Sequence, residues 1–533
     1  MDEGAFDYII VGAGSAGCVL ANRLSADGRS RVLLLEAGGR DSNPWIHIPV
    51  GYFKTMNNPA VDWRYRTEPD PGLAGRALDW PRGKVLGGSS SLNGLLYVRG
   101  QPQDYDRWAQ MGAIGWAWDD VLPLFRRSED QQRGADALHG SGGPLAVSDT
   151  RVARKICSQW MEAAEAAGYP RNPDINGPVQ EGMTYAQLTA RGGWRCSAAT
   201  AFLRPAMKRA NLRVVTRAQV ERVEISGGRA TGVTYVDAAN HRHSARAEGE
   251  VILSAGAIGS PQILMLSGVG PAEHLANMGI EVRRDLGGVG QNLQDHLQAR
   301  LVFKCREPTL NDEARSLLGK AKIGLQYALT RRGPMAMAAS LIIGFVRTRD
   351  NLETPDIQFH IQPWSADSPG EGVHPFSAFT ASVCQLRPES RGALELKSPD
   401  MRDHPVIRPN YLATPTDRRT VIDGVRITQA IAAKPPLRDS ITEAHSPTEE
   451  VRSDEEILDW VRRTATTIYH PSGTCRMGTD SRAVVDPRLR VHGVERLRVV
   501  DCSIMPDLTS GNTNAPTIMI GEKGSDLILA DRR

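Results

Sequence analysis

Residues 6–36 carry the feature that most constrains how this chain of 533 residues can fold. The apolar run FDYIIV is followed by GAGSAG, in which Gly12, Gly14 and Gly17 have the spacing G-x-G-x-x-G. A helical pattern comes next, and a second apolar run, RVLLLE, ends at Glu36. The order strand, glycine turn, helix, strand predicts a parallel βαβ unit at the start of an α/β domain.

Each position in such a unit has its own task. The first glycine permits a tight turn, the second lets the backbone approach a pyrophosphate, and the third lets the helix pack closely on the strand. The N–H groups at the helix N-terminus face the phosphates, and a carboxylate at the position of Glu36 binds ribose hydroxyls. We therefore predict a dinucleotide site; the alternative is a glycine turn in an ordinary α/β protein. The predicted residues here are Gly12, Gly14, Ser15, Ala16, Glu36 and Ala37.

Composition excludes several other classes of protein. The 64 basic and 61 acidic residues give a net charge of only +3, and there is no basic stripe with interleaved aromatics, so we expect no nucleic-acid partner. The seven cysteines are scattered singly without a CxxC pair, which is typical of reduced thiols in the cytoplasm. The start, MDEGAFDYII, is acidic where a signal peptide is basic. We expect a cytoplasmic protein, with peripheral association at the cytoplasmic face of a membrane left open.

The order of the patterns predicts a discontinuous first domain. Strand and glycine-turn patterns recur after residue 196 and again close to residue 500, so the chain leaves the nucleotide domain and returns to it at the end. We assign residues 1–155, 196–305 and 462–533 to this domain. From about residue 306 to 460 the sequence changes to alternating strands, prolines and surface loops. We assign residues 156–195 and 306–461 to a second domain and expect its mixed sheet to cover the nucleotide.

Two further segments resemble a known family. GKVLGGSSSLNGLLYVRGQPQDYD, residues 83–106, is similar to the first signature of the glucose–methanol–choline (GMC) flavoprotein oxidoreductases. GAIGSPQILMLSGVG, residues 256–270, is similar to the second. GVGQNLQDH and the stretch from VVDCSIMP to GNTNAPTIMIGEK match further family segments, so the resemblance runs from residue 6 to about residue 527. Within the family the chain resembles bacterial choline-type and aliphatic or polyether alcohol dehydrogenases.

The resemblance implies FAD, a Rossmann-like FAD domain with a mixed-sheet substrate domain (α/β, or α+β by some schemes), and a set of further cofactor contacts. Some members tether the flavin through a histidine just before the asparagine of the first signature. Leu92 stands at that position here, so we expect non-covalent FAD. Val220 is expected to meet adenine through its backbone, with plain core packing as the alternative. The implied contacts are Val85, Gly87, Ser89, Asn93, Gly94, Val220, Ala255, Asp501, Cys502, Asn512, Pro516 and Thr517.

The resemblance also implies a catalytic pair. His470 in HPSGTCRMG occupies the place of the family's base, and its partner position falls on Asn514. Histidine suits the task because its ordinary pKa of ~6.5 leaves it largely neutral at pH 7. The alternatives are a structural histidine or a metal pair with Cys475; zinc needs three or four clustered ligands, so we predict no metal. His296 is expected to brace the cofactor-side loop rather than to react.

We therefore expect FAD-dependent oxidation of a primary alcohol to an aldehyde, with a quinone, a dye-like acceptor or oxygen taking the electrons and the protein a monomer or homodimer. The alternatives are an oxygen-using oxidase, a non-redox member of the family (a hydroxynitrile lyase or photodecarboxylase), and a catalytically silent FAD-binding protein. Phe359, His360 and Trp364 are candidates for the substrate wall, or else ordinary sheet core. No acidic residue is evidently committed to a quaternary ammonium, so choline is not favoured.

Overall fold

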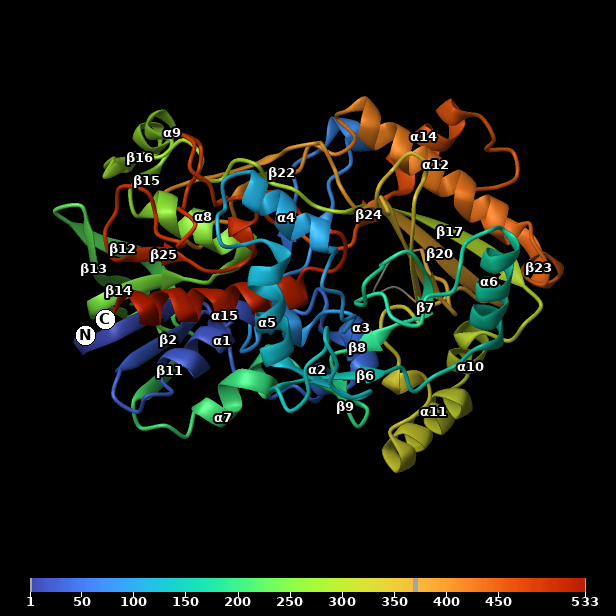
Figure 1. Cartoon of the computed structure of the whole chain (residues 1–533), viewed down its shortest axis with the longest axis horizontal. Coiled ribbons are helices and arrows are strands. Elements are labelled where there is room, and N and C mark those ends of the chain that lie inside the picture. Colours follow the sequence, from blue (N-terminus) through green and yellow to red (C-terminus); the bar gives the residue numbers. More distant parts are fainter. Residues whose placement is uncertain (1, 368–371, 533) are drawn as a thin grey trace.

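The computed structural model describes residues 2–367 and 372–532 and contains two large sheets that lie at opposite ends of the molecule (Figure 1). The first sheet has the order β11-β2-β1-β14-β13-β12, with β25 beside β14. Pairs among β11, β2, β1, β14 and β25 are parallel, and β12, β13 and β14 pair antiparallel. Its strands are β1 (Asp2–Val11), β2 (Val32–Glu36), β11 (Leu212–Thr216), β12 (Gln219–Ser226), β13 (Arg229–Val236), β14 (Arg242–Leu253) and β25 (Leu497–Val499).

The predicted βαβ unit is the centre of this sheet. Every residue of β2 is buried, as expected for a central parallel strand covered on both faces. Helix α1 (Ser15–Leu24) follows β1, and the closing helix α15 (Asn514–Asp531) packs against it. Arg23 of α1 pairs at 2.7 Å with Glu522 of α15, whose side chain is fully buried. The chain therefore returns to its first domain at the end, as predicted, and both termini lie at the same side of the molecule (Figure 1).

The second sheet has the order β23-β17-β20-β19-β18-β7, with β24 beside β17. We expected a mixed sheet here, but its pairs are antiparallel throughout the described residues. Helices α12 (Pro415–Ala432) and α6 (Lys155–Ala166) cover its outer side (Figure 1). Its strands are β7 (Gly182–Tyr185), β17 (Leu297–Cys305), β18 (Ile342–Val346), β19 (Ile357–Gln362), β20 (Ala378–Gln385), β23 (Ile441–Ser446) and β24 (Thr466–Thr467).

Strands β17 and β24 join the second sheet although the predicted boundaries give residues 297–305 and 466–467 to the first domain. The alternating pattern LQARLVFKC marks a half-buried strand but does not say which sheet it joins. His296 immediately precedes β17 and His470 follows β24 by three residues. Both histidines therefore lie at the junction between the two sheets. The division into two domains otherwise stays a proposal.

Candidate active site

The geometry of the turn between β1 and α1 fits the roles predicted for its glycines. Gly12 has a φ of +100°, and a Cβ there would lie 2.5 Å from the Ser254 oxygen. A Cβ on Gly17 would lie 1.9 Å from the Gly12 oxygen, so only glycine lets α1 pack this closely. At Gly14 the nearest such atom is 3.8 Å away, and the residue borders a large cavity. The open approach at Gly14 suits a pyrophosphate.

The Glu36 carboxylate lies at the end of β2 and borders the same cavity. It accepts hydrogen bonds from the backbone N–H groups of Ala13 (2.9 Å) and Gly38 (2.8 Å). Burial nevertheless raises its pKa to about 7. The carboxyl is therefore fixed in position by the backbone, and a carboxyl oxygen retains acceptor capacity for a ribose hydroxyl.

This cavity runs from the β1–α1 turn to His470. Among the predicted cofactor residues, all except Val85, Gly87 and Pro516 border it. Gly87 does not border the cavity, but its N–H donates to the Ala13 oxygen at 2.8 Å and so connects the glycine–serine segment to the β1–α1 turn. Val85 is fully buried, and Pro516 lies in the first turn of α15. The residues that border the cavity are Gly12, Gly14, Ser15, Ala16, Glu36, Ala37, Ser89, Asn93, Gly94, Val220, Ala255, Asp501, Cys502, Asn512 and Thr517.

His470 is held by its backbone as well as its ring. Its N–H donates to Asp295 Oδ1 at 2.7 Å. The other carboxylate oxygen of Asp295 accepts from Tyr411 Oη at 2.5 Å and from Thr467 Oγ1 at 2.6 Å. With both carboxylate oxygens occupied, Asp295 fixes the loop that carries His470 without contacting the imidazole.

The ring contacts of His470 define its tautomer. His296 Nε2 lies 2.9 Å from the Leu386 carbonyl oxygen, which only accepts, so this nitrogen carries the proton. In neutral His296 the Nδ1 atom is then an acceptor, and it lies 3.0 Å from His470 Nδ1. His470 Nδ1 must therefore be the donor, which leaves the lone pair on His470 Nε2. His296 thus contacts the ring of His470 rather than only the cofactor-side loop that we expected it to brace. That it does not itself react stays a prediction.

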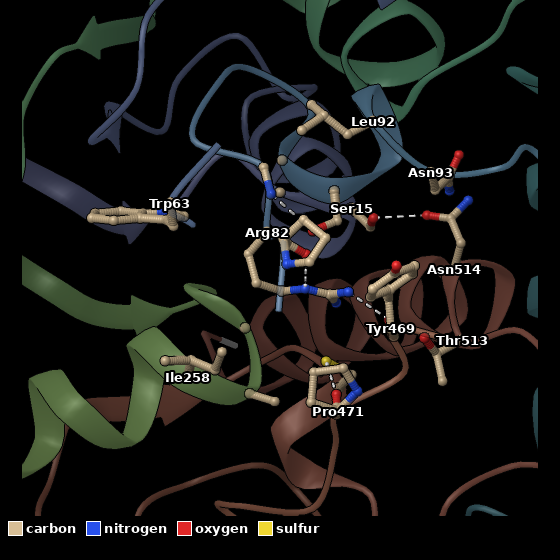
Figure 2. A pocket seen from close by; sticks show the side chains of 18 of the residues that line it. Ser15, Trp63, Arg82, Leu92, Asn93, Ile258, Tyr469, Pro471, Thr513 and Asn514 are labelled. Atoms are coloured by element: carbon tan, nitrogen blue, oxygen red, sulfur yellow. Dashed lines mark hydrogen bonds between the residues drawn. The ribbon is translucent and has the colours of Figure 1, made fainter. Parts of the chain in front are cut away.

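Asn512, rather than Asn514, is the amide beside the base. Asn512 Nδ2 lies 3.2 Å from His470 Nε2, and its Oδ1 accepts from Gln358 Nε2 at 3.3 Å. The Asn514 side chain instead accepts from Ser15 Oγ at 2.8 Å (Figure 2). The pairing predicted for Asn514 is thus corrected. The physical reason is that α15 begins at Asn514 and directs this residue toward the start of α1, whereas Asn512 lies on the extended segment before the helix.

Electrostatics keep the base neutral. Burial, followed by the neighbouring His296, His360 and Arg82, holds the pKa of His470 well below its ordinary value. Burial lowers the pKa of His296 to about 4, which agrees with the neutral form in the tautomer argument. In this arrangement the Nε2 lone pair accepts from the Asn512 amide N–H, and a hydroxyl that binds between the two groups can give its proton to Nε2 while its oxygen accepts from the amide.

Two residues at the second sheet escaped the sequence analysis. Gln298 and Arg300, on β17, both border the cavity. The signal was present: positions 296, 298 and 300 alternate and so share one face of a strand. The same alternation separates the predicted wall residues, since His360 and Trp364 border the cavity whereas Phe359 packs on Trp160 at a ring distance of 5.8 Å.

Comparison with known proteins identifies the family. Models of the GMC oxidoreductase family match residues 6–298 and 388–521. The chain belongs to the GMC oxidoreductase family. An alcohol dehydrogenase [acceptor] of Pseudomonas putida is 44% identical over 527 residues, covering 98% of this chain and 96% of the relative. The mitochondrial choline dehydrogenase of Homo sapiens is 45% identical, covering 98% and 89%. A structure of Aspergillus oryzae formate oxidase, from work on its FAD modification, has a TM-score of 0.91 at 28% identity, covering 100% and 99%.

Membership of this family confirms the resemblance inferred from the two signatures, the α/β fold class and the assignment as an oxidoreductase. Within residues 2–367 and 372–532, no helix combines the length and apolarity needed to cross a bilayer. The roles of individual site residues stay predictions.

Proposed function

We propose that this protein is an FAD-dependent dehydrogenase that oxidises a primary alcohol to the aldehyde and passes the electrons to a quinone or another acceptor. The single observation that carries the proposal is the His470–Asn512 pair, a neutral base and an amide donor 3.2 Å apart, both lining the cavity that the β1–α1 turn also borders. Two relatives support the proposal: an alcohol dehydrogenase and a choline dehydrogenase are similar to this protein along nearly the whole chain.

The residues present fit FAD. Gly14 leaves backbone open to the cavity, Glu36 stands at the end of β2 for the ribose, and the start of α1 faces the same space. The amide of Asn93 and the hydroxyl of Ser89 border the cavity farther along. When bound, FAD supplies the acceptor for the hydride.

We infer that FAD is held without a covalent link. Leu92 borders the cavity and packs with Ile46, Val61 and Val85, and a leucine side chain offers no nucleophile to a flavin. Precipitation of the holoenzyme with acid is expected to release all of the flavin into the supernatant. Flavin retained in the washed pellet would contradict this inference.

The chain's own groups have distinct tasks in the reaction. His470 Nε2 takes the hydroxyl proton as the carbinol carbon gives up its hydride, and Asn512 Nδ2 donates to the oxygen that is becoming a carbonyl. His296 holds His470 in the tautomer that makes this possible, and Gln358 orients the Asn512 amide. These contacts arise at the junction of the two sheets, where His470 is buried.

The test is the rate constant for anaerobic flavin reduction by a panel of primary alcohols. His470→Ala is expected to lower it ~10²- to 10⁴-fold, the usual contribution of a general base. Asn512→Ala is expected to lower it ~10²-fold or more, as for one lost oxyanion donor. Asn514→Ala is the matched control, two residues away, and should leave the rate within about threefold while weakening the contact with Ser15.

The outcomes separate the alternatives. Normal reduction by His470→Ala, or a larger loss in Asn514→Ala than in Asn512→Ala, would overturn the assigned roles. Flavin that stays oxidised with every alcohol would favour a non-redox member of the family. Stoichiometric peroxide in air, with slow turnover on a quinone or dye, would assign an oxidase instead of a dehydrogenase.

A further inference from the structure

Arg300 places a positive charge at the far end of the cavity from the cofactor turn. It lies on β17, and its Nη2 atom is buried without a hydrogen-bond partner. Among the described residues, no carboxylate forms an ion pair with it; the nearest contacts are a long one of 3.5 Å to the Asp367 carbonyl oxygen and the Trp364 ring at 6.0 Å. The Asp367 carboxylate is engaged with His374 instead.

A cluster of further unpartnered polar atoms borders the same end of the cavity. Leaving a buried donor or acceptor unpaired costs ~1–3 kcal/mol, more for a charged group. Because several such costs meet at one place, a ligand that supplies the missing partners is the simplest way to offset them. The buried atoms without partners are Tyr52 Oη, Arg300 Nη2, His360 Nε2, Gln362 Oε1 and Trp364 Nε1.

Sheet register fixes the position of this cluster relative to the base. Gln298 of β17, Cys384 of β20 and Gln358 of β19 form one row across the sheet, and Gln358 holds Asn512. Arg300, Ser382 and His360 form the next row on the same face. Two residues along a strand span ~7 Å. The guanidinium therefore belongs to a row about 7 Å beyond the one that orients the catalytic amide.

The charges along the cavity have a clear polarity. The acidic residues among its described lining are Glu36 and Asp501, both in the cofactor turn region. Asp501 is itself satisfied by the Gly256 N–H at 2.9 Å and by Ser260 Oγ at 2.6 Å. At the other end, Arg300 lines the cavity, whereas Asp367, the acid whose charge acts on it, does not line the cavity and contacts His374. This end therefore presents a cation, which repels a cationic substrate and attracts an anionic one.

We propose that the alcohol oxidised by this protein carries an anionic group, a carboxylate, several carbons from its hydroxyl, and that Arg300 binds this group. The inference rests on the proposed function, which places the hydroxyl at His470 and Asn512. Tyr52 Oη and Trp364 Nε1 supply neutral donors beside the guanidinium. A carboxylate accepts from all three, whereas a quaternary ammonium satisfies none of them.

The test compares three substrates of equal chain length: 6-hydroxyhexanoate, 1-hexanol and 6-amino-1-hexanol. In single-turnover flavin reduction, the hydroxy acid is expected to have an apparent Kd about 10- to 100-fold lower than hexanol, the usual gain from hydrogen bonds to a charged group. The amino alcohol should bind most weakly. Arg300→Gln should abolish the advantage of the hydroxy acid while leaving hexanol within threefold, and Arg300→Glu should shift the preference toward the amino alcohol. Arg222→Gln, on the exposed face of β12, is the control.

The results distinguish this inference from the proposed function. Equal Kd values for the three substrates, or equal losses for all three in Arg300→Gln, would overturn the anion site while alcohol oxidation stands. If no alcohol reduces the flavin, the proposed function fails, and calorimetric titration of the holoenzyme with adipate still tests the site. Adipate binding that disappears in Arg300→Gln supports the anion site, and its absence in the wild type overturns it. Flavin content of each variant checks that it is folded.

Helix α11 (Leu317–Thr330) carries a second, independent feature, an unpartnered apolar surface. It projects from the second sheet at the lower right of Figure 1. Four of its leucines are mostly exposed: Leu317 at 85%, Leu318 at 81%, Leu325 at 62% and Leu329 at 75%. Their spacing places them along one side of the helix, and we call these four residues the leucine face. Tyr327 is buried on the opposite side and anchors the helix.

Positive charge and an aromatic ring border the leucine face. Between Glu313 and Asp350 the sequence has no acidic residue, whereas Lys320 and Lys322 lie within the helix and two arginines follow it directly. Trp194, 41% exposed, packs on Tyr327 at a ring distance of 5.8 Å, with Arg331 4.5 Å above its ring. A basic helix with exposed leucines and a flanking tryptophan is typical of segments that lie in the interface of a bilayer.

We also propose that the leucine face binds the surface of an anionic lipid bilayer. Charge distinguishes the two partners that fit an apolar face, a lipid bilayer and a second copy of the chain. A second copy of the chain would bring the same positive helix against itself, which costs energy, whereas an anionic headgroup layer neutralises it.

Sedimentation with vesicles tests this surface. The holoenzyme is expected to bind vesicles of phosphatidylcholine containing about a third phosphatidylglycerol, to bind pure phosphatidylcholine at least tenfold more weakly, and to be released by high salt. Leu325→Asp with Leu329→Asp should abolish binding, and Ile114→Asp, another largely exposed apolar residue (79%), is the control. Unaltered binding of the double variant overturns the proposal. A dimer in analytical ultracentrifugation that the same substitutions dissociate assigns the face to a second copy instead.

Discussion

At one end of the cavity the surface is backbone, and at the other end it is side chain. The β1–α1 turn meets the cofactor space through Gly14 and the first N–H groups of α1, and its shape depends on the missing Cβ atoms of Gly12 and Gly17. The β17–β20–β19 wall meets it through polar side chains such as Gln298 and Arg300. Backbone surfaces demand particular residues at fixed spacing, so they leave a motif. A wall made of side chains tolerates many residue types, so it can determine substrate specificity without leaving a sequence motif.

The largest effect is expected at the backbone end. Gly17→Val places a branched side chain against the Gly12 oxygen, where even a Cβ would lie at 1.9 Å. We expect a loss of more than ~5 kcal/mol in the free energy of unfolding and no folded holoenzyme. Gly14→Val has room, with its nearest contact at 3.8 Å, so it should lose FAD while the protein stays folded. Thermal unfolding and the flavin-to-protein absorbance ratio measure the two effects, and similar behaviour of both variants would contradict the assigned roles.

The next effect distinguishes the two faces of the wall. Phe359 is fully buried on the outer face against Trp160, so Phe359→Ala is expected to cost ~3–5 kcal/mol of unfolding free energy. His360, its neighbour on β19, borders the cavity and has an unpartnered Nε2. His360→Gln should cost no more than ~1.5 kcal/mol but change kcat/KM. Denaturant unfolding gives the change in unfolding free energy, and steady-state kinetics give the change in kcat/KM. If only Phe359→Ala changed kcat/KM, Phe359 rather than His360 would face the cavity.

A smaller effect is expected from acid. Burial lowers the pKa of His360 to about 3 and that of His296 to about 4, against ~6.5 in the unfolded chain. As pH falls below ~6.5 the unfolded state binds protons first. The stability these histidines contribute is therefore present above that pH and lost on acidification, at up to ~1.4 kcal/mol per pH unit for each.

Buried carboxyls such as Glu36, whose pKa is raised to about 7, oppose this trend. The prediction therefore compares two proteins. Between pH 6.5 and pH 4, the wild-type protein should lose more unfolding free energy than the His360→Gln variant. Parallel curves would show that His360 is already protonated in the folded state.

The smallest effect is expected in the pH dependence of the chemistry. Burial and the neighbouring groups hold the pKa of His470 well below its ordinary value, so the proposed base is neutral. The rate constant for flavin reduction should therefore be flat at pH ~6.5 and above, and should fall only in more acidic solution. Stopped-flow measurements with one alcohol across pH 5–9 check this, and a rate that keeps rising up to pH 8 would indicate a raised pKa.

The same contrast explains what could be predicted from sequence. The βαβ unit, the return of the last helix and the place of His470 at the cavity followed from glycine spacing and from resemblance in backbone-constrained segments. The choice between Asn512 and Asn514 did not, because it depends on the residue at which α15 begins, and GNTN offers an asparagine on either side of that point. Arg300 was missed because its importance lies in the absence of a partner, which only the packed sheet reveals.

The ion pair between Arg23 and Glu522 has a consequence for synthesis of the protein. Its two residues are 499 positions apart. At about 5–20 residues per second, the first βαβ unit waits roughly 25 to 100 s on the ribosome before the helix that covers α1 has been made. During that interval the side of α1 that packs on α15 has no native cover, and the cavity lacks the asparagine and histidine that line it. The nascent chain therefore depends on protection from other molecules for as long as translation lasts. A chain whose translation stops early has the β1–α1 turn but lacks His470 and Asn512.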